Sequence, residues 1–180
     1  MRVIAGTHKR RRIKTVDKAS TRSTKDRVKE TLFNMLGPLH GKTHVLDLFA
    51  GAGALGIEAL SRGVDKATFV ESDKDAFKVL HENLDALSLL SRATLYQTNA
   101  ETFLIDTSDT YDLIVLDPPY DTDLLMKTLK HIETSGCLKP DGVCVTLSSK
   151  KTVIDMPQSF QIKKERTVGI TNVCFYEWSE

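Results

Sequence analysis

The stretch DLIVLDPPYD, residues 112–121, has the residue types needed for chemistry on an amine. Its apolar run is typical of a strand buried in a sheet, and the run ends on Asp117. Asp117 and the carbonyl of Pro118 could accept the two N–H bonds of an exocyclic amine on a nucleobase, which would free the amine lone pair for attack on an electrophile. Pro118 and Pro119 would fix that carbonyl, because their φ angles are locked, and Tyr120 offers a ring for base stacking.

We therefore predict a catalytic site at Asp117, Pro118, Pro119 and Tyr120. The alternative is a proline-rich turn after a buried strand, with the aspartate as its first residue. The surroundings of the tetrapeptide decide between the two interpretations.

A glycine-rich loop in DLFAGAGALGIEAL is the second candidate site. Gly51, Gly53 and Gly56 have the G-x-G-x-x-G spacing, which allows a tight turn and presents helix N–H groups to a ligand. Glu71, at the end of the next predicted strand, could hold ribose hydroxyls. This pattern fits a dinucleotide and S-adenosylmethionine equally well.

Asp47, just before the glycine loop, favours a cationic ligand. A carboxylate there would weaken the binding of a pyrophosphate, as in NAD, and would strengthen the binding of a positive group. S-adenosylmethionine carries a sulfonium and an ammonium group, so we predict it as the cofactor. The alternatives are that Asp47 only caps the turn and that the chain is a nicotinamide-dependent dehydrogenase.

Two more polar residues follow predicted strands. Asn99 could bind the edge of an adenine or could cap a short helix, and both interpretations stay open. For Asp73 we predict a helix-capping role.

The pattern of the whole chain predicts the element arrangement that positions these residues. Strand-like runs alternate with helical patterns over residues 43–149, which indicates a parallel sheet with helices on both faces. Two further strand patterns, residues 160–169 and 171–178, have no helix between them and predict an antiparallel edge. We expect a doubly wound α/β fold with a mostly parallel seven-stranded, Rossmann-like sheet. Its ligand should lie at the carboxyl ends of the strands, where Asp117 faces the glycine loop.

Positive charge is concentrated at the start of the chain. Residues 1–30 contain 11 Lys and Arg against 3 Asp and Glu, a net charge of +8, and the remaining residues contain 14 against 21, a net charge of −7. Such a basic segment indicates a polyanionic partner such as nucleic acid. A solvated tail and a nuclear localisation signal are the alternatives.

The basic segment has its own predicted structure. Residues 2–5 and 11–16 predict a small β-hairpin, and Ser23 followed by Asp26 resembles the capping box of a helix. We expect a basic extension over residues 1–22 and the main domain over residues 23–180.

Composition places the chain among ordinary globular proteins. It has 180 residues, of which 41% are hydrophobic and 27% are charged, which argues against disorder. With neither a membrane-length apolar stretch nor a secretory signal, a cytoplasmic protein is expected.

The three cysteines, Cys137, Cys144 and Cys174, have no C-x-x-C spacing. We predict that they are inert, and we expect no metal site.

These motifs together resemble a known family. The segments RVIAG, TRSTKDRVKETLFNML, LDLFAGAGALGIEALSRG, VESD, LDPPY and GITNVCFY are similar, in order, to segments of the RsmD-type 16S ribosomal RNA guanine-N2-methyltransferases. That family belongs to the Class I S-adenosylmethionine-dependent methyltransferases. One departure is Ser23, which precedes Thr24 where the family usually has proline.

The resemblance implies roles for particular residues. The cofactor would be surrounded by Asp47, Phe49, Gly51, Gly53, Glu71, Ser72, Asn99 and Ala100. The target amine would be held by Asp117, Pro118, Pro119 and Tyr120. The RNA, alone or within the small ribosomal subunit, would be faced by Arg10, Arg11, Arg12, Arg22 and Arg27.

Other functions use related sequences. A DNA adenine-N6-methyltransferase normally adds a long target-recognition region, and the enzymes that methylate glutamine in release factors tend to have Asn at the position of Asp117. A compact chain with a basic extension suits a structured RNA from which a base is splayed out. The non-enzymatic alternative is an RNA-binding module with a degenerate cofactor fold.

Overall fold

A computed structural model describes residues 1–16, 22–39, 41–120 and 122–179, with only the backbone described for residues 22–25. The helices are α1 (Arg22–Leu36), α2 (Ala54–Ser61), α3 (Lys74–Ala86), α4 (Ala100–Asp106) and α5 (Leu124–Ser135), with a short 3₁₀ helix at Leu90–Arg92. The strands are β1 (His44–Asp47), β2 (Lys66–Val70), β3 (Ala93–Tyr96), β4 (Tyr111–Leu116), β5 (Leu138–Ser149), β6 (Phe160–Val168) and β7 (Thr171–Trp178).

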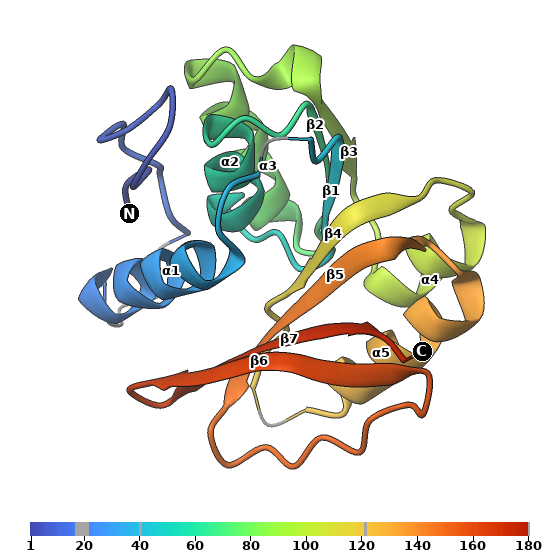
Figure 1. Cartoon of the computed structure of the whole chain (residues 1–180). Coiled ribbons are helices and arrows are strands. Elements are labelled where there is room, and N and C mark those ends of the chain that lie inside the picture. The colour runs from blue at the N-terminus through green and yellow to red at the C-terminus, as the bar shows by residue number, and fades with distance from the viewer. Residues whose placement is uncertain (17–21, 40, 121, 180) are drawn as a thin grey trace.

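The strands form one seven-stranded sheet in the order β3-β2-β1-β4-β5-β7-β6 (Figure 1). The pairs from β3 to β5 are parallel, whereas β7 is antiparallel to both β5 and β6. The predicted doubly wound fold with an antiparallel C-terminal edge is therefore confirmed. Strand β4 lies beside β1, as expected, and Val115 pairs with Asp47.

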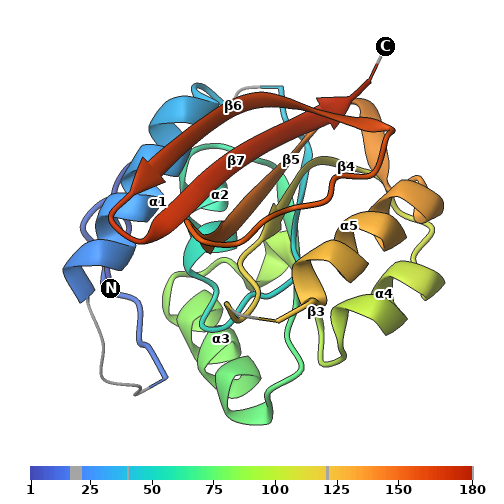
Figure 2. The ribbon, with the colours of Figure 1, turned by 90° about the horizontal axis from the view of Figure 1, so that it is seen from below.

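Helices cover both faces of the sheet (Figures 1 and 2). Alternate residues of the central strands point to opposite faces, so Val45 joins the core under α1, α2 and α3, and Leu46 joins the core under α4 and α5. Strand β4 alternates in the same way. Burial on both faces explains why these strands are continuous apolar runs.

The N-terminal segment packs along α2 and α3 and is less regular than predicted. In place of two strands it has one isolated antiparallel bridge, between Arg2 and Arg12, supported by backbone hydrogen bonds such as Val3 N–H to the Arg11 carbonyl at 3.0 Å. The helix that follows begins at Arg22, so Ser23 lies inside its first turn, and the capping box predicted at Ser23 is wrong. Residues 17–21 lie outside the described part of the chain.

A buried ionic cluster fixes this segment to the main domain. Both carboxylate oxygens of Glu58, a fully buried residue of α2, accept backbone N–H bonds, one from Ile4 at 2.8 Å and one from Ala5 at 3.0 Å. The same carboxylate pairs with Lys29 of α1 and with Arg62. Hydrogen bonds and ion pairs to one side chain thus connect the N-terminal segment, α1 and α2.

The three cysteines are buried and unpaired. Burial raises the pKa of each thiol, which keeps the thiol protonated and supports the prediction that these cysteines are inert. No helix in the described ranges combines the length and apolar character that a membrane span requires.

Candidate functional site

A large pocket opens at the carboxyl edge of the sheet, where the predicted ligand site should lie. Its volume is about 1090 Å³, which is ample for a small-molecule cofactor. The loops after β1, β2, β3 and β4 contribute to its wall, together with the start of α5. The pocket therefore combines the two motifs that the sequence singled out.

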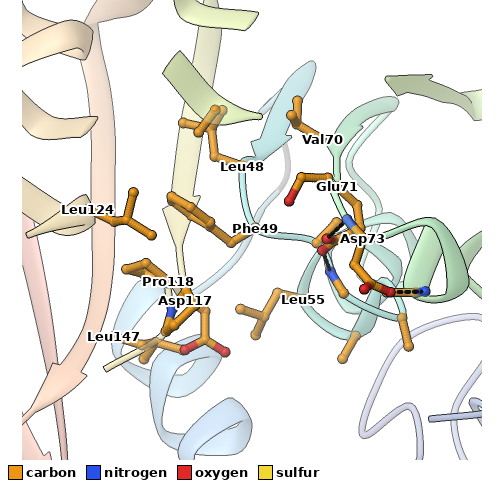
Figure 3. Close-up of a pocket in the computed structure, with 18 of the residues that line it drawn as sticks. Leu48, Phe49, Leu55, Val70, Glu71, Asp73, Asp117, Pro118, Leu124 and Leu147 are labelled. Carbon is orange, nitrogen blue, oxygen red and sulfur yellow. Dashed lines mark hydrogen bonds between the residues drawn. The ribbon is translucent and has the colours of Figure 1, made fainter. Parts of the chain in front are cut away.

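The carboxylate of Glu71 is held at the glycine loop. One of its oxygens accepts the N–H of Gly51 at 2.7 Å, and the other accepts the N–H of Asp73 at 2.7 Å. Both bonds are drawn in Figure 3, where Glu71 follows Val70 into the pocket. A carboxylate fixed in this way is well placed to accept bonds from the hydroxyls of a ribose.

Asp47 has a different position from the one expected. Its side chain is 1% exposed and does not line the pocket. One carboxylate oxygen accepts the N–H of Gly56 at 2.9 Å, while the other has no hydrogen-bond partner among the described residues. The pKa of Asp47 is raised to about 7, chiefly by burial; the Gly56 hydrogen bond opposes the rise, and the charges of Asp117 and Glu71 contribute to it. Three carboxyl groups thus lie close enough to interact.

Two of the three glycines serve the turn and the packing. Gly53 has a φ of 87°, in the left-handed region, and forms the N-terminal cap of α2. A Cβ on Gly56 would lie 2.2 Å from the ring of Phe69, so glycine allows α2 to pack directly on β2. Neither glycine lines the pocket, whereas Gly51 does.

The predicted amine site lies across the pocket from Glu71. Asp117 is exposed and Pro118 is buried, and both line the cavity with Pro119 and Tyr120. In the view of Figure 3, Phe49 and Leu55 lie between the Asp117–Pro118 wall and Glu71. A ligand bound between the two walls would therefore contact both motifs.

Tyr120 is positioned by a residue from the far end of the sequence. Its hydroxyl lies 3.1 Å from the hydroxyl of Thr171, the first residue of β7. Burial raises the pKa of Tyr120, and so does the charge of Asp117, whereas the hydrogen bond between Tyr120 and Thr171 lowers it. The phenol therefore stays protonated, and its ring orientation is fixed by β7.

The remaining predicted cofactor residues are also at the pocket. Phe49, Ser72, Asn99 and Ala100 all line it. The side chain of Asn99 caps α4 by accepting the N–H of Thr102 at 2.8 Å. Asp73 caps α3 in the same way through Ala76 at 2.8 Å, which confirms the predicted capping role.

Acidic side chains dominate the charge of the pocket wall. Among the described residues, five acidic side chains line it against two lysines and one histidine. The acidic residues are Glu71, Asp73, Asp75, Glu101 and Asp117. This balance favours a cationic ligand over a pyrophosphate. The described side chains form no group of three or more His, Cys, Asp or Glu residues placed to hold a metal ion.

Of the predicted RNA-facing arginines, Arg10, Arg11, Arg12 and Arg27 do not line the pocket. Arg11 donates to the carbonyl of Ala86, the last residue of α3, whereas Asp75 and Ala76, at the start of α3, line the pocket. Ten residues of helix separate these points by about 15 Å. Arg10 and Arg12 are exposed in the same segment, Arg27 is exposed on α1, and the side chain of Arg22 lies outside the described residues.

Comparison with known proteins gives the family. The family described as conserved hypothetical protein 95 matches residues 1–177, and the ribosomal RNA small subunit methyltransferase D of Haemophilus influenzae is 34% identical, with 98% of this chain and 93% of the relative covered. The chain belongs to the RsmD family. A putative rRNA methyltransferase, YlbH, of Bacillus subtilis is 38% identical, with 98% of each chain covered. The solved structure of the putative methyltransferase yhhF from Escherichia coli has a TM-score of 0.88 at 30% identity and covers 100% of this chain and 98% of that one.

Several pocket residues of this RsmD-family chain were not among the sequence predictions. The N-terminal segment and α1 contribute Met1, Ile13, Thr15, Val16, Val28 and Lys29, and the region around β7 contributes Leu147, Ile170 and Thr171. The apolar patterns of β1 and β2 could have indicated Leu48, directly after β1, and Val70, the last residue of β2. The other residues reach the pocket through contacts far apart in the sequence, which no local pattern indicates.

Proposed function

We propose that this RsmD-family protein transfers a methyl group from S-adenosylmethionine to the exocyclic N2 amine of a guanine in 16S ribosomal RNA. The observation that carries the proposal is that Glu71 and Asp117, at the tips of β2 and β4, line one cavity. The names of the relatives support ribosomal RNA of the small subunit as the substrate. The D-P-P-Y sequence supports an amine as the acceptor.

The residues at the glycine loop fit S-adenosylmethionine. The acidic wall suits its positive charge. Glu71 would hold the ribose, Phe49 and Leu48 would pack on apolar parts of the cofactor, and Asn99 would lie near the adenine. When bound, the cofactor supplies an electrophilic methyl group on a sulfonium. Calorimetry with S-adenosylmethionine and NAD side by side tests this choice, and a preference for NAD would overturn it.

The tetrapeptide acts on the amine. The Asp117 carboxylate and the Pro118 carbonyl accept its two N–H bonds and draw the nitrogen towards tetrahedral geometry. The Pro119 carbonyl already accepts a bond from the hydroxyl of Thr122 at 2.9 Å, whereas no such bond to the Pro118 carbonyl is found within the described residues. As positive charge develops on the nitrogen, the Asp117 carboxylate stabilises the transition state more than the ground state. Tyr120 supports the target base by stacking.

The N-terminal segment forms part of the RNA surface in this proposal. Residues 1–22 form an RNA-facing extension of the transferase domain, residues 23–180. Arg10, Arg11, Arg12, Arg22 and Arg27 neutralise phosphates. Because Arg11 contacts the end of α3, about 15 Å along the helix from its pocket-lining start, it would contact RNA some distance from the target nucleotide.

One incubation tests the function. The protein is mixed with labelled S-adenosylmethionine and with 16S ribosomal RNA or small subunits from a strain that lacks the enzyme, and the nucleosides are analysed. We expect N2-methylguanosine in at least one of the two substrates. A methylated adenine or a labelled protein as the only product would contradict the proposal.

A further inference from the structure

Four residues lie in the turns after β5 and before β7, and one of them, Ile170, lines the pocket. We call them the β7 rim: Lys150 and Lys151, after β5, and Gly169 and Ile170, between β6 and β7. Ile170 lines the pocket and yet is 64% exposed. The backbone N–H of Lys150 donates to the carbonyl of Ile170 at 2.9 Å, so the two turns are joined.

The β7 rim lies at the same edge of the sheet as the amine site. Strand β5 is parallel to β4, so its end at Ser149 and the end of β4 point the same way. Strand β7 is antiparallel to β5 and therefore begins at this edge, where Ser149 pairs with Thr171. Thr171 in turn contacts the hydroxyl of Tyr120. The rim is thus connected to the tetrapeptide through one residue.

The rim combines positive charge with exposed apolar surface. Lys150 and Lys151 are exposed, and neither side chain has an ion pair or hydrogen bond within the described ranges. They stand in a part of the chain, residues 31–180, whose net charge is −7. Exposed lysines without an ion-pair partner among the described residues are suited to a polyanion. An exposed isoleucine at a pocket mouth is suited to pack against an apolar surface of the partner, including one that the partner exposes only in the complex.

RNA with a splayed-out base offers both features. Moving a base out of its stack exposes the faces of the neighbouring bases, and apolar side chains are used elsewhere to cover such faces. The phosphates on either side of the flipped nucleotide must lie close to the pocket mouth. Arg11, which contacts the last residue of α3, lies about 15 Å along that helix from its pocket-lining start.

We propose that the β7 rim is a second RNA-contact surface, in which Lys150 and Lys151 neutralise phosphates beside the target nucleotide and Ile170 packs against a base next to it. This inference rests on the proposed function and adds a surface and its partner. RNA is chosen over a protein partner because the exposed lysines supply positive charge, and because the backbone N–H of Lys150 is bonded to Ile170, which lines the pocket that would hold the base.

Two variants and two matched controls test the rim. Ile170→Ala removes the apolar contact, and the double variant Lys150→Ala/Lys151→Ala removes the charges. Ile105→Ala, at an isoleucine that is 70% exposed on α4, and Lys66→Ala, at the amino end of β2, are the controls. For each full-length protein, kcat/KM for the RNA or subunit that the wild type methylates is measured over salt concentrations from about 0.05 to 0.2 M.

We expect Ile170→Ala to lower kcat/KM about tenfold, and the double lysine variant to reduce the slope of log kcat/KM against log salt by about 1.4, the value for two phosphates of single-stranded RNA. The controls should match the wild type, and all variants should bind S-adenosylmethionine equally. Rim variants with wild-type kcat/KM and an unchanged salt slope would overturn the inference.

A crosslink identifies the partner. Ile170→p-benzoylphenylalanine is irradiated with the same substrate, and adducts are separated into RNA and protein. An RNA adduct near the methylated guanine supports the inference, and an adduct to a subunit protein alone overturns it. Failure of the proposed function looks different, because the wild type itself then methylates no RNA. In that case the rim is tested by comparing RNA binding of the wild type with that of the rim variants.

Discussion

The Nζ of Lys29 lies 3.2 Å from a carboxylate oxygen of Glu58, with the lysine side chain 2% exposed and that of the glutamate 0% exposed. Lys29 also donates to the backbone carbonyl of Arg2. Burial lowers the pKa of Lys29, and the charge of Glu58 opposes this shift. The pair therefore holds the N-terminal segment and α1 in a place where both line the pocket.

Glu58→Gln should loosen the N-terminal segment. Removing one partner of a buried ion pair leaves a buried charge uncompensated, and we expect a loss of about 3 to 5 kcal/mol in the free energy of unfolding, measured by urea denaturation. Limited proteolysis should cut the chain within residues 1–16 faster than in the wild type.

The exposed pair of Lys127 and Asp123 gives the control for Glu58→Gln. Its side chains are 63% and 69% exposed. Asp123→Asn should leave stability and proteolysis unchanged, because solvent screens such a pair. Equal effects of the two substitutions would show that burial of the Glu58 pair has no consequence for the segment.

Asp47 should give the protein a pH-dependent stability. Its pKa in the folded protein is about 7, above the ordinary value of 3.8, so the folded state binds the proton more tightly than the unfolded state. The resulting stabilisation is full below pH 3.8 and is lost as the pH rises to 7. As the pH rises from roughly 5 to 8, the free energy of unfolding of the wild type should fall relative to that of Asp47→Asn. The fall should reach up to about 1.4 kcal/mol per pH unit. Parallel curves for the two proteins would contradict the raised pKa.

Tyr120 and Thr171 should behave as a coupled pair in catalysis. Both Tyr120→Phe and Thr171→Val break the hydrogen bond between the two hydroxyls, so each should lower kcat several-fold through a less ordered ring. The double variant should be no worse than either single variant, because the same interaction is lost. Additive losses in this double-mutant cycle would show that the two residues act independently.

The arrangement of the sheet was predictable because its physical causes are local. Buried parallel strands are continuous apolar runs, and strand-helix alternation fixes the topology. The adjacency of β1 and β4 followed from that topology, and with it the position of Asp117 across from the glycine loop. Capping by Asp73 is equally local, since it depends on a residue three positions away.

The pocket wall depended on contacts between distant residues. Glu58 lies among apolar residues of α2 and gives no sign of burial until Ile4, Ala5 and Lys29 surround it. The Tyr120–Thr171 contact joins residues 51 positions apart. Asp47 was expected at a ligand, yet its carboxylate turns to the N–H of Gly56, because the start of α2 lies directly behind the strand tip.

The most direct test of the account is methyl transfer by Asp117→Ala compared with the wild type, measured with labelled S-adenosylmethionine and small-subunit RNA or subunits, alongside cofactor binding by calorimetry. Asp117 is exposed at the pocket, so the fold should not depend on its side chain. The account predicts a turnover at least about a hundredfold lower, as expected when a group that stabilises the transition state is lost, with cofactor affinity nearly unchanged. Turnover retained at the wild-type level would contradict it.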